Sequence, residues 1–122
     1  MSADFTYDPV TAVDEKSATG IIAEIFADIR EVMGIPLVTS IWRGLAGMDN
    51  SLEVAWRAAR PIYLHGHPES VLVRVVDRTE LPIPEPLVPS QLAAIGINVE
   101  ALFQIRTIID AYNRSNGMNL IG

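Results

Sequence analysis

The stretch that decides the fold class of this chain is residues 17–34, SATGIIAEIFADIREVMG. Its apolar residues recur at intervals of three and four and form one stripe of a helix: Ile21, Ile22, Ile25, Phe26, Ile29, Val32 and Met33. The acidic residues lie off that stripe: Glu24, Asp28 and Glu31. Ser17 or Thr19 can cap the start, and Gly34 followed by Pro36 is typical of a helix end. The stretch therefore predicts an amphipathic helix.

Similar signals predict more helices downstream and no sheet. A short helix is expected from Thr39 or Ser40 to about residue 46, and another begins at residue 50 or 51. Pro61 lies inside this third helix, where it should kink the helix or end it nearby. Residues 69–81, ESVLVRVVDRTEL, are rich in valine and favour a strand by propensity. Because no partner strands are available for them, we expect a helix there as well.

The second half of the chain is predicted to be a connector followed by two helices. Residues 81–89, LPIPEPLVP, suit an extended proline-punctuated segment on the surface. Residues 89–96 predict a short helix, and Asn98 is placed to cap a last helix that ends at Gly117. The inner stripe of that last helix is expected to hold Leu102, Ile105, Ile108 or Ile109, and Tyr112. The fold class is thus all-α, a single compact helical domain of five to six helices.

The first sixteen residues show no clear period. We expect residues 1–16 to form an extended arm laid over the body, with Phe5, Tyr7 and Val10 as anchors, and an unstructured tail is the alternative. Residues 17–122 then form the helical unit.

Composition excludes several classes of function. The 122 residues are 49% hydrophobic and 20% charged, as in soluble globular proteins. The chain has no cysteine, which excludes disulfides, thiolate metal sites and cysteine nucleophiles. Its net charge of −6 argues against nucleic-acid binding. We find neither a membrane-spanning run nor a signal peptide, so a cytoplasmic protein without a membrane partner is expected.

The ionisable residues do not predict a catalytic centre or a metal site. His65 and His67 lie two residues apart on an expected turn without further ligands nearby, so we interpret them as solvated loop residues. The carboxylates of the first helix are expected on its solvated face. Asp110 and Arg114 have the i,i+4 spacing of a helical ion pair, which accounts for both. No cofactor and no metal are predicted.

Three asparagines recur every third residue near the predicted end of the last helix, at Asn113, Asn116 and Asn119. Asparagine is a poor helix former, and helix capping beside Gly117 explains one of the three. Alternatively, the three amides are neutral donors that hold a small carboxylate. Both interpretations stay open.

Trp42 and Arg43 stand side by side in an otherwise apolar, small-residue run. In most proteins such a tryptophan is part of the core, and such an arginine caps a helix or extends its head to solvent. An indole N–H beside apolar walls also suits a poorly hydrated leaving anion such as a halide.

These segments together resemble one family, the group I 2-haloacid dehalogenases. The resemblance is to their N-terminal repeat and is carried by residues 17–46, SATGIIAEIFADIREVMGIPLVTSIWRGLA, with AWRAARPIY at 55–63 and IDAYNRSNGMNL at 109–120. It implies an all-α fold in which two similar repeats face each other across the active site. It also implies that activated water displaces halide from the α-carbon, without a cofactor or a covalent intermediate. Carried over to this sequence, the implied substrate-binding residues are Trp42, Leu45, Asn113, Asn116 and Asn119.

The chain departs from that family at Ile41. In the family, the aspartate that activates water belongs to the second repeat, in the segment equivalent to TSIWRGLA, and here Ile41 stands at its position. The resemblance therefore implies one half of a dehalogenase, with no catalytic residue of its own. The expected partners are a small (halo)carboxylic acid and a second repeat or a second copy, the latter as a C2 homodimer. The alternative is a non-catalytic helical module for carboxylate binding or dimerisation.

A weaker likeness is to the helical fold of alkylhydroperoxidases and carboxymuconolactone decarboxylases. The redox branch of that group depends on a CxxC pair, and the absence of cysteine excludes it.

Overall fold

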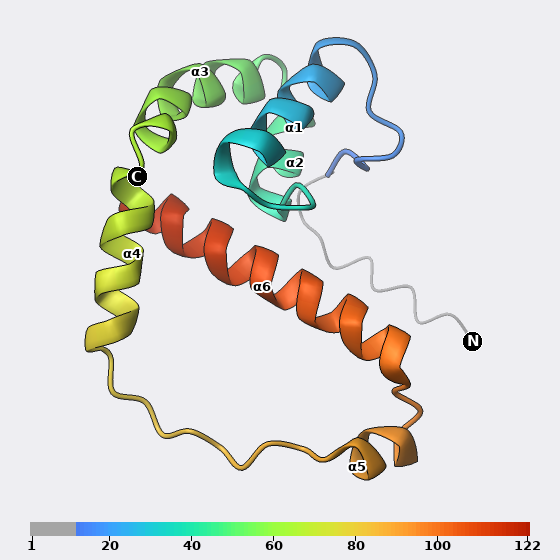
Figure 1. Cartoon of the computed structure of the whole chain (residues 1–122). Coiled ribbons are helices and arrows are strands. Elements are labelled where there is room, and N and C mark those ends of the chain that lie inside the picture. The colour runs from blue at the N-terminus through green and yellow to red at the C-terminus, as the bar shows by residue number, and fades with distance from the viewer. Residues whose placement is uncertain (1–11) are drawn as a thin grey trace.

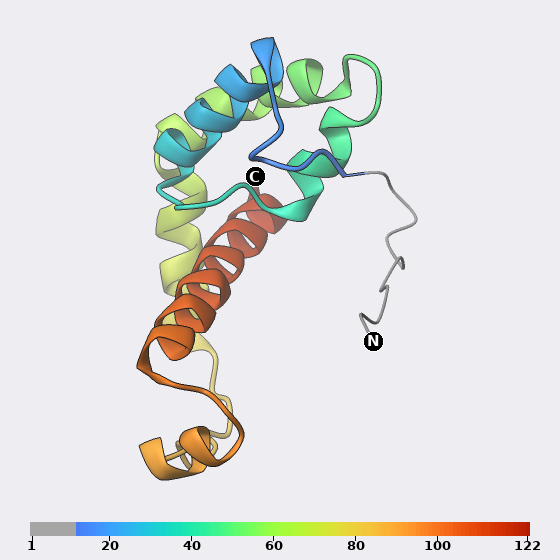
Figure 2. The same cartoon turned by 90° about the vertical axis from the view of Figure 1, so that its right-hand side faces the viewer.

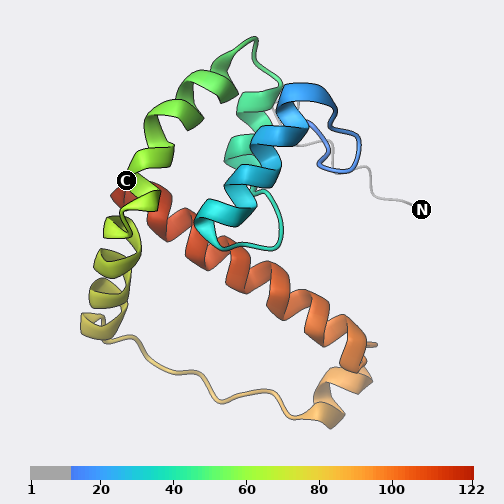
Figure 3. The same cartoon turned by 45° about the horizontal axis from the view of Figure 1, so that its top comes forward.

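This computed structural model describes residues 12–122 of the chain. These residues contain six α-helices and no strand. They are α1 (Gly20–Met33), α2 (Ser40–Ala46), α3 (Ser51–Leu64), α4 (His67–Arg78), α5 (Pro89–Ala94) and α6 (Val99–Ile121). Helices α1 to α3 gather at one end of the molecule, and α4 extends away from the end of α3 (Figure 1). Helix α6 runs back diagonally, so that its C-terminal end meets the corner between α3 and α4 (Figures 1 and 3). The predicted all-α fold class is confirmed.

Local signals place several helix ends where the sequence predicts them. Gly34 follows α1 in the left-handed conformation, with φ of 64°, and its N–H bonds to carbonyls of the last turn. Asn98 caps α6, since its Oδ1 accepts a hydrogen bond of 2.8 Å from the Ala101 N–H. Helix α3 continues through Pro61 and ends at Leu64. The proline therefore stands in the last turn of the helix.

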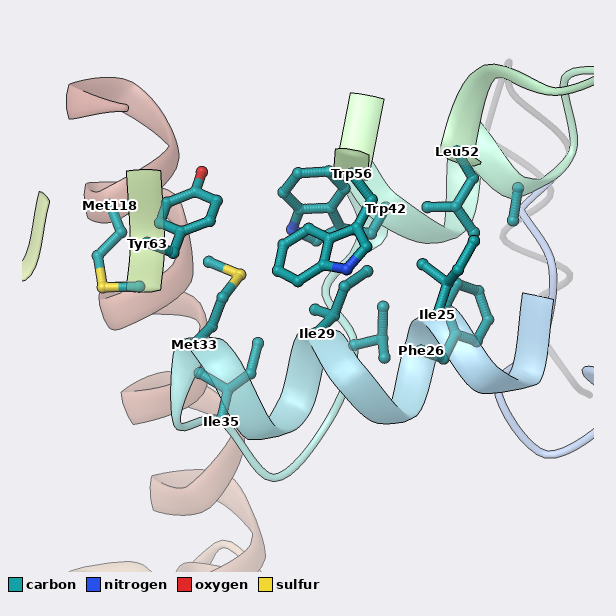
Figure 4. Packing of buried hydrophobic residues seen from close by; sticks show 12 residues of the cluster. Ile25, Phe26, Ile29, Met33, Ile35, Trp42, Leu52, Trp56, Tyr63 and Met118 are labelled. Atoms are coloured by element: carbon teal, nitrogen blue, oxygen red, sulfur yellow. The ribbon is translucent and has the colours of Figure 1, made fainter. Parts of the chain in front are cut away.

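The hydrophobic core lies between α1, α2, α3 and the C-terminal part of α6 (Figure 4). Helix α1 packs mainly against α3. As predicted, the stripe of α1 supplies much of the core. Its buried residues are Ile25, Phe26, Ile29 and Met33. Three aromatic rings from α2 and α3 complete it, and the rings of Trp42 and Trp56 meet edge to face with 5.3 Å between their centroids.

The valine-rich segment is helical, as expected, and forms most of α4. Helix α4 packs against α6 and leaves Val73, Val75 and Val76 exposed. Residues 79–88 have no regular secondary structure and are exposed throughout, which confirms the connector between α4 and α5. The connector lies apart from α6 in the views of Figures 1 and 3, whereas in Figure 2 it passes behind the N-terminal half of α6.

Two predictions about the last helix are wrong. Gly117 does not end α6, which continues through it to Ile121. A Cβ at Gly117 would lie 2.6 Å from Leu72 Cδ1, so glycine permits the close packing of α6 on α4. The inner stripe also differs from the predicted one, because Ile105, Ile108 and Ile109 are exposed. The buried residues of α6 are Ala111, Ser115 and Met118.

Residues 12–16, the described part of the segment for which an extended arm is predicted, contact α1, α2 and the loop between them. The Val13 N–H donates a 3.0 Å hydrogen bond to the Arg43 carbonyl, and Glu15 forms an ion pair with Arg30. Glu15 also accepts a 2.8 Å hydrogen bond from the Val38 N–H. The proposed anchors Phe5, Tyr7 and Val10 lie outside the described residues.

Candidate functional site

Trp42 lies in the core, with only 5% of its surface exposed. Its ring is edge-on to Tyr63, with 6.4 Å between the centroids, and the labelled rings stand beside Ile29 and Met33 of α1 (Figure 4). The indole Nε1 is buried and has no hydrogen-bond partner among the described residues. An unpaired buried donor costs about 1–3 kcal/mol, so the position of this indole calls for a reason beyond packing. Leu45 is half-buried and packs against the same core.

A chain of polar side chains joins α6 to α2 and α3. At its centre, the buried hydroxyls of Thr39 and Ser115 are 2.8 Å apart. Ser115 Oγ also accepts a long contact of 3.5 Å from Asn119 Nδ2. The Tyr63 hydroxyl donates to Asn119 Oδ1 over 2.7 Å, and burial raises the pKa of Tyr63, which keeps its hydroxyl protonated. The bond from Tyr63 orients the Asn119 amide, with its oxygen toward α3.

Ile41, Asn116, Asn119 and Leu120 line one groove of about 330 Å³ between α2 and α6. Ile41 and Leu120 are 53% and 89% exposed, so the groove is bordered by apolar side chains that face solvent. None of its four lining residues is ionisable at neutral pH. The groove can therefore offer amide hydrogen bonds and apolar contact, but no proton acceptor. Below we call it the amide groove.

The structure separates Asn113 from the other two asparagines. Asn113 lines a different groove, between α4 and α6, together with Leu72, Val76 and Arg114. Of the five substrate-binding residues expected from the resemblance, Asn116 and Asn119 share a groove. Trp42 is connected to them through Tyr63, and Asn113 lies elsewhere.

The expected ion pair between Asp110 and Arg114 is wrong. Arg114 Nε instead donates a 2.7 Å hydrogen bond to the Met33 carbonyl, and its Nη1 lies 3.1 Å from Glu69. The last carbonyls of a helix lack partners within the helix, and the cation also complements the dipole of α1 at this end. Arg114 thus holds α1, α4 and α6 together, and it lowers the pKa of Glu69 by hydrogen bonding.

Asp28 is also more engaged than a residue on a solvated face. Its carboxylate accepts hydrogen bonds from Trp56 Nε1 at 2.7 Å and from Arg60 Nε at 2.6 Å. The hydrogen bond from Arg60 is the main cause of the lowered pKa of Asp28. This arrangement ties α1 to α3. We interpret it as structural.

The two histidines are exposed, His65 just after α3 and His67 at the start of α4. Across residues 12–122, no group of three or more His, Asp or Glu side chains is placed to hold a metal ion. No helix in that part of the chain has both the length and the apolar character needed to cross a bilayer.

A comparison with known proteins found a partial similarity to one enzyme. A stretch of 55 residues is 33% identical to an (R)-2-haloacid dehalogenase from Pseudomonas putida. The similarity is partial. It covers 44% of this chain and 18% of the length of that relative, so the chain spans well under two thirds of it. No protein-family profile and no solved structure matches the chain.

Sequence reasoning missed the residues that orient the Asn119 amide. Thr39 and Ser115 are small hydroxyl residues that no motif singles out, and Tyr63 is only the last residue of the segment AWRAARPIY. Their role depends on the packing of α6 against α2 and α3, since the two hydroxyls that meet lie 76 residues apart.

Proposed function

We propose that this chain is a 2-haloacid dehalogenase-like domain that binds small 2-halocarboxylic acids in the amide groove. The reaction is hydrolytic: an activated water displaces halide from the α-carbon, with no covalent intermediate. Two observations support this proposal. They are the partial similarity to an (R)-2-haloacid dehalogenase and the presence of Ile41 in the same groove as Asn116 and Asn119. The second observation carries the proposal.

The amides of Asn116 and Asn119 are the proposed ligands for the substrate carboxylate. Asn119 Oδ1 already accepts a hydrogen bond from Tyr63. Asn119 Nδ2 makes only the long 3.5 Å contact with Ser115, so the hydrogens of this nitrogen remain available to an anion. Neutral donors bind a carboxylate without the strong desolvation cost of a buried ion pair. Trp42 and Leu45 complete the proposed set as residues implied by the family resemblance, although neither lines the amide groove, and the buried, unpaired indole N–H is the proposed contact for the leaving halide.

The catalytic base is proposed to come from a second unit. Displacement requires a proton acceptor within one water of the reacting carbon, and no ionisable residue lines the amide groove. Ile41, at the position where the family resemblance expects an aspartate, is half exposed. A second repeat or a second copy placed over Ile41 and Leu120 would cover this apolar border and bring its own residues to the groove. For two copies of this chain, we propose a C2 homodimer.

One observation favours a second candidate, a non-catalytic module that binds small carboxylates. A homodimer of this chain brings Ile41, not a carboxylate, to the opposite side of the groove. Such a module binds a 2-hydroxy acid or a 2-halo acid in the same place but releases no halide.

Halide release from each enantiomer of 2-chloropropionate tests the proposal, with light scattering to report the assembly. The dehalogenase predicts chloride release when a second unit supplies the base, whereas the non-catalytic module predicts binding of lactate without release in any assembly. Asn116→Ala should weaken binding about tenfold, because each lost hydrogen bond to a charged group costs about 1.5–3 kcal/mol. Asn113→Ala is the matched control from the other groove and should bind as the unmodified chain does. Failure to bind either acid would overturn both functions.

A further inference from the structure

A second cavity, which shares no lining residue with the amide groove, lies on another part of the molecule. Its volume is about 620 Å³, within the range of small-molecule sites. Residues 14–16 and 36–38 form two sides, and Arg30, Arg43, Ile108 and Tyr112 come from α1, α2 and α6. We call it the Arg43 cavity.

The walls of the Arg43 cavity are fixed by hydrogen bonds. The Val13 N–H donates to the Arg43 carbonyl over 3.0 Å, which holds residues 12–16 beside α2. Glu15 accepts from the Val38 N–H over 2.8 Å and forms the ion pair with Arg30. These contacts join three segments that are distant in the sequence. The cavity therefore exists before any ligand enters.

The charges around the cavity do not balance. Lys16, Arg30 and Arg43 contribute three cations, against the two carboxylates of Asp14 and Glu15, in a chain whose net charge is −6. Glu15 is already occupied by Arg30. The excess positive charge is local, and an anion entering the cavity would neutralise it.

Arg43, like Lys16, has no ion-pair partner among residues 12–122. The Nε of the Arg43 guanidinium is buried without a hydrogen bond to any of these residues. Buried polar atoms are almost always paired, and an unpaired charged group is especially costly. The guanidinium fork matches the two oxygens of a carboxylate. A ligand carboxylate in the cavity would pair with the Arg43 guanidinium, which lines it and has no ion pair with any of the residues that the structure describes.

The remaining walls favour a ligand with a short hydrocarbon part. Pro36, Leu37, Val38 and Ile108 contribute apolar surface to the cavity, and Tyr112 adds a ring with a hydroxyl. Inorganic phosphate has no group that would use the apolar walls. We infer that the Arg43 cavity is a binding site for a small aliphatic monocarboxylate, separate from the amide groove and independent of the proposed dehalogenase function.

Binding of acetate, propionate and butyrate to the full chain tests this inference, followed by calorimetry and by NMR shifts of assigned amides. Affinity should rise with each methylene, by at most about fourfold per group, as apolar surface is buried. Shifts should centre on residues 14–16, 36–38 and 43. Butyramide, which has the same shape without the charge, should not bind. Phosphate should bind more weakly than butyrate.

Two variants and a control assign the contacts. Arg43→Gln should weaken butyrate binding at least tenfold, and Arg57→Gln, at an exposed position of α3, should leave it unchanged. Leu37→Ala should reduce the increase in affinity from acetate to butyrate, while the affinity for acetate stays the same. Because this variant keeps Arg43, it remains informative if Arg43→Gln does not fold.

Three results would overturn the inference. They are the absence of shifts up to millimolar butyrate, phosphate binding as tightly as butyrate, and shifts confined to residues 116–120. The last result would assign carboxylate binding to the amide groove alone, and so would count against this site while supporting the proposed function.

Discussion

The Tyr63 hydroxyl donates a 2.7 Å hydrogen bond to Asn119 Oδ1, and this bond joins the last turns of α3 and α6. The C-terminal end of α6 meets the end of α3 at this corner (Figure 3). The same bond fixes which side of the Asn119 amide faces α3. A single contact thus serves the packing of the last helix and the orientation of a proposed ligand group.

Tyr63→Phe should lower the free energy of unfolding by about 1 kcal/mol, the usual loss for one hydrogen bond. The ring stays and keeps its contact with Trp42 and its stacking on Trp56, so the effect isolates the hydroxyl. Urea denaturation measures it. Tyr112→Phe removes a hydroxyl from a half-buried position without a comparable bond and serves as the control. Equal losses in the two variants would show that the bond to Asn119 contributes little.

Gly117→Ala should destabilise the protein although alanine is the better helix former. The new Cβ would lie 2.6 Å and 2.9 Å from the two methyl groups of Leu72, and such overpacking costs about 1–3 kcal/mol against about 1 kcal/mol gained in helix propensity. In a Leu72→Ala background the clash disappears, so the same change should become neutral or stabilising. The unmodified protein, the two single variants and the double variant are unfolded in urea, and their free energies of unfolding give the coupling energy between positions 117 and 72. Simple additivity would mean that α4 and α6 are not in close contact here.

The sequence predicts the features of this fold that depend on neighbouring residues. The stripe of α1 and its end at Gly34 need only helical spacing and a residue suited to the left-handed conformation. The Asn98 cap needs only the N–H three residues later. Even the valine-rich segment is interpreted correctly as α4, because strands require partners that this chain does not offer.

The features that depend on distant residues are the ones that sequence reasoning misses. Gly117 suits a helix end and a close helix contact equally well, and only the position of Leu72 decides between them. Arg114 has an acidic residue one turn before it. Its Nε nevertheless donates its hydrogen bond to the carbonyl of Met33, 81 residues away, which has no partner within α1. The amide groove depends in the same way on α2 and α6 coming together.

Asp28 should make stability depend on pH in the acidic range. Its pKa in the folded protein is lowered from the ordinary 3.8, chiefly by Arg60, so the unfolded chain takes up a proton first as the pH falls. The stabilisation is therefore fully present above about pH 5 and is lost as the pH falls below 4 toward the lowered value. Asp28→Asn should flatten that part of the curve, measured by urea unfolding from pH 6 to pH 2.5. Glu24→Gln, at an exposed position of the same helix, should leave the dependence of stability on pH unchanged. If Glu24→Gln flattens the curve as much as Asp28→Asn does, Asp28 is not the cause.

Ile41→Asp should introduce the missing base into the amide groove if two copies of the chain pair across it. The position is half exposed, so a carboxylate can be accepted there without burial of an unpaired charge. A correctly placed general base contributes roughly 10²–10⁴-fold to a rate. The control is Ile41→Asn, because asparagine has nearly the same shape as aspartate but lacks the basic oxygen. The Ile41→Asp variant should release halide from 2-chloropropionate faster than this control by a factor in that range. The increase should follow the ionisation of the new carboxyl and vanish when Asn116→Ala removes a substrate contact. If scattering reports a dimer and both substitutions at Ile41 release halide equally slowly, then the base does not act from this position, and the pairing of two such groove faces is the wrong assembly.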